Sequence, residues 1–156
     1  MKEEKRAKAI TFIIDSRLEN VSLLGVAVRG ICSHLSFGEL DTYYMELCVV
    51  EAVNNIIKHA YSLEPGHTVE VEIFPADDSM IFEVRDTGRL MNIIKTERYA
   101  SNFETETLCD LSESGLGLLL IHSLMDKVVY KRIDDKNILT LKKYVTKLQP
   151  EQSAVC

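Results

Sequence analysis

The sequence lacks several features that would each define a class of protein. Its 4 cysteines are far apart and show no Cys-x-x-Cys spacing, so neither a zinc site nor a disulfide framework is predicted. No apolar run approaches membrane-spanning length, and no cleavage-site pattern follows the charged N-terminus, residues 1–8. We therefore expect a cytoplasmic protein without membrane contact. We also expect reduced thiols at Cys32, Cys48, Cys109 and Cys156.

An excess of basic residues is also missing. Asp and Glu outnumber Lys and Arg by 24 to 18, and the formal net charge is -6. Proteins that bind nucleic acid regardless of sequence gain most of their affinity by neutralising phosphates with Lys and Arg, so we expect no direct nucleic-acid partner. The 156 residues suit one domain, which we place at 1–147, with a flexible tail at 148–156.

Hydrophobic periodicity predicts alternating strands and helices in an order that defines a fold class. The order is strand, two helices, two strands, a long loop, a helix and two strands, which puts the helices on one face of a mixed or mostly antiparallel sheet. We therefore predict an α+β fold, a two-layer sandwich. The predicted elements are a strand at 7–14, helices at 21–35 and about 39–61, strands at 68–74 and 80–84, a helix at 116–125, and strands at 128–133 and 138–145.

Two segments suggest more than a structural role. Residues 87–114 are polar and show no period, and a loop of this length in a compact domain is typical of a functional lid. The first strand is more apolar than an exposed edge strand should be, which suggests a dimer contact. In the second helix, Tyr44, Leu47, Val50, Asn54 and Ile57 are predicted to lie along one side.

The second helix carries a carboxylate, an amide and an imidazole at spacing four. Glu51, Asn55 and His59 would lie in one line and face one cavity. Asn55 offers a carbonyl oxygen of the kind that Mg²⁺ accepts, and Glu51 could deprotonate an attacking hydroxyl. Taken alone, the same spacing is more typical of the solvated face of an amphipathic helix.

Two further motifs contain glycine. In the first, Asp86 ends a strand and Gly88 follows, so that a carboxylate can accept a hydrogen bond from an exocyclic amine while the backbone approaches a ligand. In the second, Gly115 and Gly117 open a helix whose first N–H groups can bind phosphate. An ordinary turn and an ordinary helix cap explain each motif equally well when it is considered alone.

The three motifs in this order resemble the N, G1 and G2 boxes of the GHKL ATPases. Residues 51–61, EAVNNIIKHAY, closely resemble the N box of the bacterial anti-sigma-factor serine kinases of the RsbW and SpoIIAB type. Residues 115–121 and 124–126 are similar to the G2 helix of that family, and 138–144 to its closing strand. The resemblance covers about residues 11–144.

This resemblance implies a Bergerat-type α/β sandwich that binds ATP and Mg²⁺. It implies that Asn55 is a ligand of Mg²⁺, that Glu51 is the general base toward a substrate serine, and that Asp86 binds adenine. The other positions that it implies at the nucleotide are His59, Gly88, Gly115, Leu116 and Gly117.

The resemblance also implies partners. Members of the family usually dimerise, hold a sigma factor inactive, and phosphorylate a serine on a STAS-domain anti-anti-sigma protein. The sequence departs from the family at two positions: Leu90 occupies the second glycine of the G1 box, and Glu113 stands where some relatives have a basic residue.

Two other interpretations remain open at this point. The ATP-binding domain of a histidine kinase shares the same boxes, but it normally follows a helix pair that carries the phosphoacceptor histidine. A binding module of the same fold could keep ATP as a structural ligand and act by sequestering a partner. The presence of both Glu51 and Asn55 favours retained catalysis.

Overall fold

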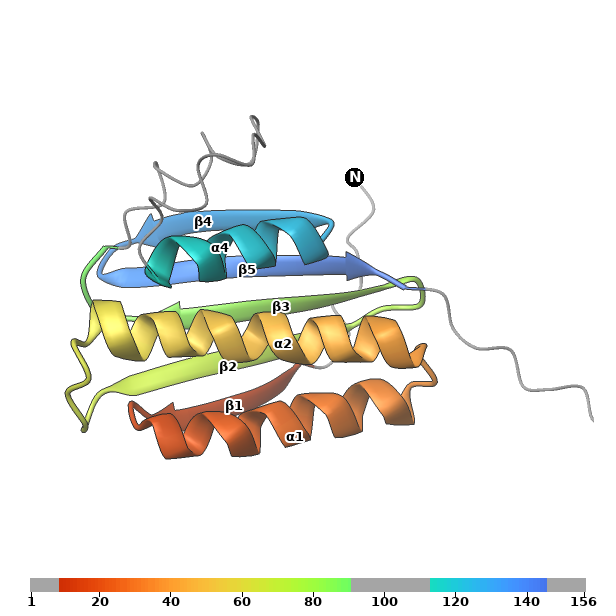
Figure 1. Ribbon diagram of the computed structural model, residues 1–156, viewed down its shortest axis with the longest axis horizontal. Coiled ribbons are helices and arrows are strands. Elements are labelled where there is room, and N and C mark those ends of the chain that lie inside the picture. Colours follow the sequence, from red (N-terminus) through yellow and green to blue (C-terminus); the bar gives the residue numbers. More distant parts are fainter. Residues whose placement is uncertain (1–8, 91–112, 146–156) are drawn as a thin grey trace, which may run out of the picture.

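The computed structural model describes residues 9–90 and 113–145 (Figure 1). Within them, a 5-stranded antiparallel sheet is covered on one face by the helices, while its other face carries none (Figure 1). The predicted two-layer α+β sandwich is confirmed. Most of the predicted lid, at 87–114, and the predicted tail, at 148–156, lie outside the described residues.

The order of the strands in the sheet is β1-β2-β3-β5-β4. The last strand of the chain is thereby inserted between β3 and β4, and β1 and β4 are the two edges. Each pair of neighbours is antiparallel. The strands are β1 (Ile10–Asp15), β2 (Thr68–Pro75), β3 (Ser79–Asp86), β4 (Lys127–Ile133) and β5 (Lys136–Tyr144).

Alternation along the central strands separates a core face from an open face. Every second residue of β2 and β3 is buried, because successive side chains of a strand point to opposite sides. The buried side chains face the helices and form the sheet's half of the core. They are Val69, Val71, Ile73, Met80, Phe82, Val84, Leu139 and Leu141.

The open face of the sheet holds one arginine among three glutamates. Arg85 lies 2.8 Å from Glu70 and 2.6 Å from Glu72, and it also pairs with Glu83. Burial by itself would lower the pKa of Arg85, but the hydrogen bonds to the three carboxylates outweigh burial and raise it. The arginine therefore stays charged and relieves the repulsion among its neighbours.

Helix α2 (Glu39–Asn55) lies at the centre of the helical layer. It contacts α1 (Leu18–His34), α4 (Glu113–Leu124) and strand β3. At Gly25 of α1, an added Cβ would lie only 3.0 Å from Val50 Cγ2, so the glycine permits the close approach of the two helices.

The predicted side of α2 is wrong for most of its members. Tyr44, Leu47, Val50 and Asn54 are only half-buried, whereas Met45 and Val49 are fully buried. Ile57, at the end of the predicted helix, is buried. Because α2 is covered by a helix on each side and by the sheet below, apolar residues occupy most of its circumference. Helical spacing alone could not select the face that packs on the sheet.

The last turn of the second helix is a π turn, η1 (Ile56–Ala60). The Tyr61 N–H donates to the Ile56 carbonyl across five residues, at 3.0 Å. The predicted end of the helix near Tyr61 is therefore confirmed, although its final turn is wider than an α turn. Single π turns of this kind are frequent at functional sites.

Two of the four cysteines lie within the described residues. Cys32 and Cys48 are buried and free, and burial raises the pKa of both thiols to about 12. They are thiols at neutral pH, as predicted. Among the helices that the structure describes, none is both long and apolar enough to cross a bilayer.

Two isoleucines on opposite faces of the sheet test this arrangement. Ile73 is fully buried toward the helices, and Ile13 on the edge strand is 68% exposed. We expect Ile73→Ala to lower the free energy of unfolding by about 2–5 kcal/mol, because it leaves a cavity in the core. The same change at Ile13 should cost less than about 1 kcal/mol. Urea denaturation of both variants measures the difference, and equal losses would contradict the assigned faces.

Candidate functional site

Asn55 is a buried amide with an unused hydrogen-bonding group. It is 3% exposed, and its Nδ2 atom has no hydrogen-bond partner among the described residues. A buried polar group without a partner costs about 1–3 kcal/mol, so such groups are rare in native proteins. The most direct explanation is a ligand that completes the site.

Glu51 lies one helical turn before Asn55 and is half-buried. It packs against Gly117 of α4, where an added Cβ would lie 2.7 Å from Glu51 Cδ and would overlap Oε1. Any side chain at Gly117 would therefore displace the carboxylate. The contact brings together two of the three motifs that the sequence singles out.

Helix α4 begins earlier than predicted. It starts at Glu113, so Gly115 and Gly117 lie inside its first two turns and do not precede it. Packing of α4 on α2 outweighs the low helix propensity of glycine. Gly115 is half-buried, whereas Leu116, which the resemblance implied at the nucleotide, is 44% exposed.

Asp86 ends strand β3 as a carboxylate that is only 4% exposed. Its Oδ1 atom accepts hydrogen bonds from the Gly88 N–H and from Asn137 Nδ2, both at 2.8 Å. Burial raises the pKa of Asp86, while the bonds from Asn137 and Gly88 and the charge of Arg132 oppose the rise. Both of these hydrogen bonds use the same oxygen atom of the carboxylate.

Gly88 also makes a close structural contact that the sequence did not predict. An added Cβ would lie 2.7 Å from Ala60 Cβ and 2.8 Å from the Ala60 carbonyl oxygen. The adjacent Arg89 N–H donates to that same carbonyl at 3.2 Å. The glycine thus lets the segment after β3 pack on the end of the helix and satisfy one of its unpaired carbonyls.

His59 does not share the position of Asn55. It lies in the π turn η1 and is exposed, whereas Asn55 is buried. That His59 faces the same cavity as Glu51 and Asn55 stays a prediction.

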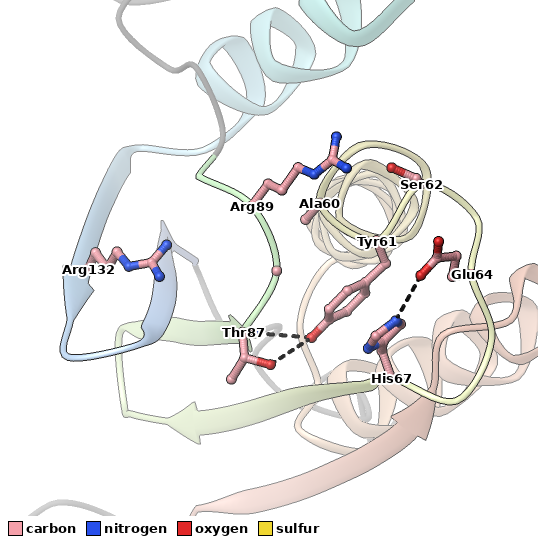
Figure 2. Close-up of a pocket in the computed structure, with 9 residues that line it drawn as sticks. Ala60, Tyr61, Ser62, Glu64, His67, Thr87, Arg89 and Arg132 are labelled. Carbon is pink, nitrogen blue, oxygen red and sulfur yellow. Dashed lines mark hydrogen bonds and ion pairs between the residues drawn. The ribbon is translucent and has the colours of Figure 1, made fainter.

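A pocket of about 390 Å³ adjoins the candidate site (Figure 2). Gly88 is the one predicted site residue in its lining, and the pocket carries the exposed cations Arg89 and Arg132. Figure 2 shows Arg132 on one side of the segment that bears Thr87 and Arg89. The rings of Tyr61 and His67 lie on the other side. The lining comprises Ala60, Tyr61, Ser62, Glu64, His67, Thr87, Gly88, Arg89 and Arg132.

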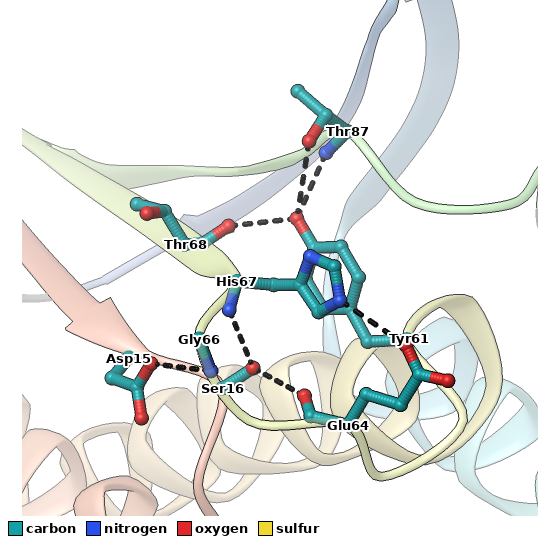
Figure 3. Close-up of polar contacts among 8 residues, drawn as sticks. All are labelled: Asp15, Ser16, Tyr61, Glu64, Gly66, His67, Thr68 and Thr87. Atoms are coloured by element: carbon teal, nitrogen blue, oxygen red, sulfur yellow. Dashed lines mark hydrogen bonds and ion pairs between the residues drawn. The ribbon is translucent and has the colours of Figure 1, made fainter.

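The hydroxyl of Tyr61 ties the end of the helix to two strands (Figure 3). It donates to the Thr68 carbonyl at 2.8 Å and accepts from the Thr87 N–H at 3.0 Å. The Tyr61 ring stacks on His67 with 4.5 Å between ring centroids. Tyr61 is 5% exposed, so these contacts fix the segment that follows Asp86.

The end of β1 joins the same junction (Figure 3). The buried Ser16 hydroxyl donates to the Glu64 carbonyl at 2.6 Å and accepts from the His67 N–H at 3.1 Å. Asp15 Oδ1 accepts from the Gly66 N–H at 2.8 Å. These bonds hold the turn around Gly66 in place.

Sequence reasoning missed Tyr61, Thr87 and Asn137. Tyr61 stood within the quoted N-box segment, but a tyrosine at the end of a helix gives no sign of its bonding partners. Asn137 lies 51 positions from Asp86, and their pairing requires knowledge of the strand order. Only the strand order would have identified Asn137 as the partner of Asp86.

The donor set limits how a metal could bind. Within the described ranges, no group of three His, Cys, Asp or Glu side chains could hold a metal ion. Mg²⁺ accepts few protein ligands and completes its coordination with phosphate oxygens and water. The amide of Asn55 fits that manner of binding, in which the protein supplies one ligand and the nucleotide supplies others.

Comparison with known proteins identifies a family and relatives that this chain resembles. Residues 14–143 match the family described as histidine kinase-like ATPase domain. The chain is 29% identical over 139 residues to the serine-protein kinase RsbW of Halalkalibacterium halodurans, covering 88% of this chain and 84% of that protein. It is also 29% identical over 147 residues to RsbW of Listeria monocytogenes serotype 4a, covering 93% and 92%.

Solved structures share the fold. The RsbU and RsbW domains of a Mycobacterium tuberculosis protein match with a TM-score of 0.65 at 13% identity. That match covers 91% of this chain but 34% of the other, so this chain spans about a third of it. The SiaB–SiaC complex from Pseudomonas aeruginosa matches with a TM-score of 0.53 at 16% identity, covering 86% of this chain and 89% of the other.

A pair of glycine substitutions tests the contact at Ala60. Gly88→Ala should lower the free energy of unfolding by about 1–3 kcal/mol, because the new methyl group meets helix backbone that cannot move aside. Gly30→Ala in α1 is the control: nothing lies within 4 Å of the added Cβ, and alanine should stabilise that helix by roughly 0.5–1 kcal/mol. Urea denaturation measures both. A stabilising Gly88→Ala would show that the contact is not close.

Proposed function

Because the chain belongs to the histidine kinase-like ATPase domain family, we propose that it is an ATP-dependent serine protein kinase that acts as an anti-sigma factor. The observation that carries the proposal is the buried Asn55 one turn after the carboxylate of Glu51, because the Asn55 Nδ2 donor has no partner among the described residues and a phosphate oxygen would satisfy it. The similarity to serine-protein kinases named RsbW supports the reaction class.

Each motif residue has a role in this proposal. Asp86 accepts a hydrogen bond from the adenine amino group, and Asn55 holds Mg²⁺ through its amide oxygen. When bound, Mg²⁺ would neutralise charge on the phosphates of the nucleotide. Gly88, Gly115 and Gly117 shape the nucleotide site, with Leu116 and His59 at its border.

Glu51 acts as the general base. It accepts the proton of a serine hydroxyl while the hydroxyl oxygen bonds to the γ-phosphorus and the bond to the ADP oxygen breaks. Gly117 is the residue that leaves room for the carboxylate, because any larger side chain would move Glu51. The products are phosphoserine and ADP.

The proposed partners are proteins. The substrate serine lies on a STAS-domain anti-anti-sigma protein, and the kinase sequesters a sigma factor when that protein is phosphorylated. We also propose that the chain forms a homodimer, which is supported by the edge strand β1 with its exposed Ile10 and Ile13. The solved SiaB–SiaC complex, which shares this fold, is itself an assembly with a second protein.

Binding of ADP tests the nucleotide site directly. With ligand at a hundredfold excess over its dissociation constant, stability should rise by about 2.7 kcal/mol. Asp86→Asn should lose most of this gain, because an N–H group replaces a carboxylate oxygen that accepts the adenine amine. Asp135→Asn is the control, since the Asp135 side chain is 99% exposed. Thermal unfolding with and without ADP and Mg²⁺ is the measurement, and equal shifts in both variants would refute the site.

Two substitutions in α2 separate binding from chemistry. Asn55→Ala should abolish the Mg²⁺-dependent part of the ATP thermal shift, because the proposed metal ligand is gone. Glu51→Gln should keep the shift and lower phosphoryl transfer to a STAS-domain protein by at least about 100-fold, because the general base is lost. Phosphoryl transfer at the wild-type rate by Glu51→Gln would refute the assignment of Glu51 as the general base.

The same experiment decides between the two forms of the proposal. Nucleotide binding by the wild type without transfer to any STAS-domain protein would favour a binding module that sequesters its partner. Transfer that depends on Glu51 would favour the kinase.

A further inference from the structure

Three polar side chains form a row across three neighbouring strands. Asp86 of β3 stands opposite Asn137 of β5, which stands opposite Arg132 of β4. Residues directly opposite in a sheet point to the same side and lie close enough to interact. Asn137 is 1% exposed, so its amide depends on partners within the protein.

The amide of Asn137 has defined partners at both ends. Its Nδ2 donates to Asp86 Oδ1 at 2.8 Å and to the Gly88 carbonyl at 3.1 Å. Its Oδ1 accepts from Arg132 Nη1 at 3.3 Å. Because a guanidinium can only donate, Arg132 favours the orientation in which the NH₂ group faces Asp86.

The hydrogen bonds to Asp86 are distributed unevenly between its two oxygens. The bonds from Gly88 and Asn137 both end on Oδ1, and no residue within the described ranges donates to Oδ2. A carboxylate oxygen can accept from the amino group of a 6-aminopurine but not from the oxygen of a 6-oxopurine. At the proposed nucleotide site, Oδ2 would therefore be the oxygen left to accept a hydrogen bond from adenine.

We propose that Arg132 and Asn137 are positioning residues for Asp86, which engage its Oδ1 and leave Oδ2 as the acceptor that selects adenine nucleotides. This inference rests on the proposed nucleotide site at Asp86. Neither residue touches the base; Asn137 acts through Asp86, and Arg132 acts through Asn137.

The electrostatics of the row support this role. Burial raises the pKa of Asp86, and Asn137, Gly88 and Arg132 each lower it. Without Asn137 the carboxyl group would more easily hold a proton, and a protonated carboxyl can donate to the oxygen of guanine. Both the orientation and the charge of the Asp86 carboxylate therefore depend on Asn137.

The test compares ADP with GDP. Dissociation constants of the full chain are measured by isothermal titration for the wild type, Asn137→Asp, Arg132→Met and Lys131→Met. Asn137→Asp keeps the size of the side chain but turns an acceptor toward Asp86. We expect it to weaken ADP binding at least about tenfold and GDP binding much less, so that the preference for ADP falls.

Arg132→Met keeps an extended stem and removes the donors. Its side chain is 33% exposed, so the variant should fold even if Asn137→Asp does not. We expect the preference for ADP to fall about threefold, a smaller change because Arg132 acts through one intermediary. Lys131→Met removes an exposed charge from the next position of β4 and should bind like the wild type.

The outcomes are distinct. An unchanged ratio of ADP to GDP affinity in folded Asn137→Asp, or in Arg132→Met if the first does not fold, overturns the inference. An equal loss of affinity for ADP and GDP also overturns the inference, because it would indicate a structural role only. If the wild type binds neither nucleotide, the proposed function fails and this inference fails with it.

Discussion

The structure depends on the junction between the end of the second helix and the ends of strands β2 and β3. The Tyr61 hydroxyl bonds to both strand ends, and Gly88 packs against the backbone of Ala60. These contacts set the spacing between the helical layer and the sheet at the place where Asn55 and Asp86 are buried. The π turn widens the end of the helix at the same place. The candidate site is thus held by backbone contacts as well as by side chains.

Much of the fold follows from local pattern. Alternation in β2 and β3 and the hairpin of β4 and β5 could be recognised from the sequence, because a half-buried strand must place apolar residues at every second position. The packing face of α2 could not, since that helix is covered on three sides. The start of α4 could not be predicted either, because packing on α2 outweighs the low helix propensity of Gly115 and Gly117.

Some residues of the candidate site could likewise be predicted from the sequence, and others could not. Glu51, Asn55 and Asp86 could be proposed from the sequence, because their chemical types occur at the positions where the motifs place them. The sequence did not show why glycine is required at positions 88 and 117. Each glycine makes room for a residue distant in sequence: Gly88 for Ala60 and Gly117 for Glu51. Asn137 gave no local signal, and its importance emerges only from the strand register.

The insertion of β5 beside β3 has a consequence for synthesis of the protein on the ribosome. Asp86 and Asn137 are 51 residues apart, and chains emerge with the N-terminal part first. Until the C-terminal hairpin has emerged, one edge of β3 is unpaired, and such edges promote association with other chains. The nascent chain is therefore most exposed to aggregation, and most in need of chaperones, until its final strand is released.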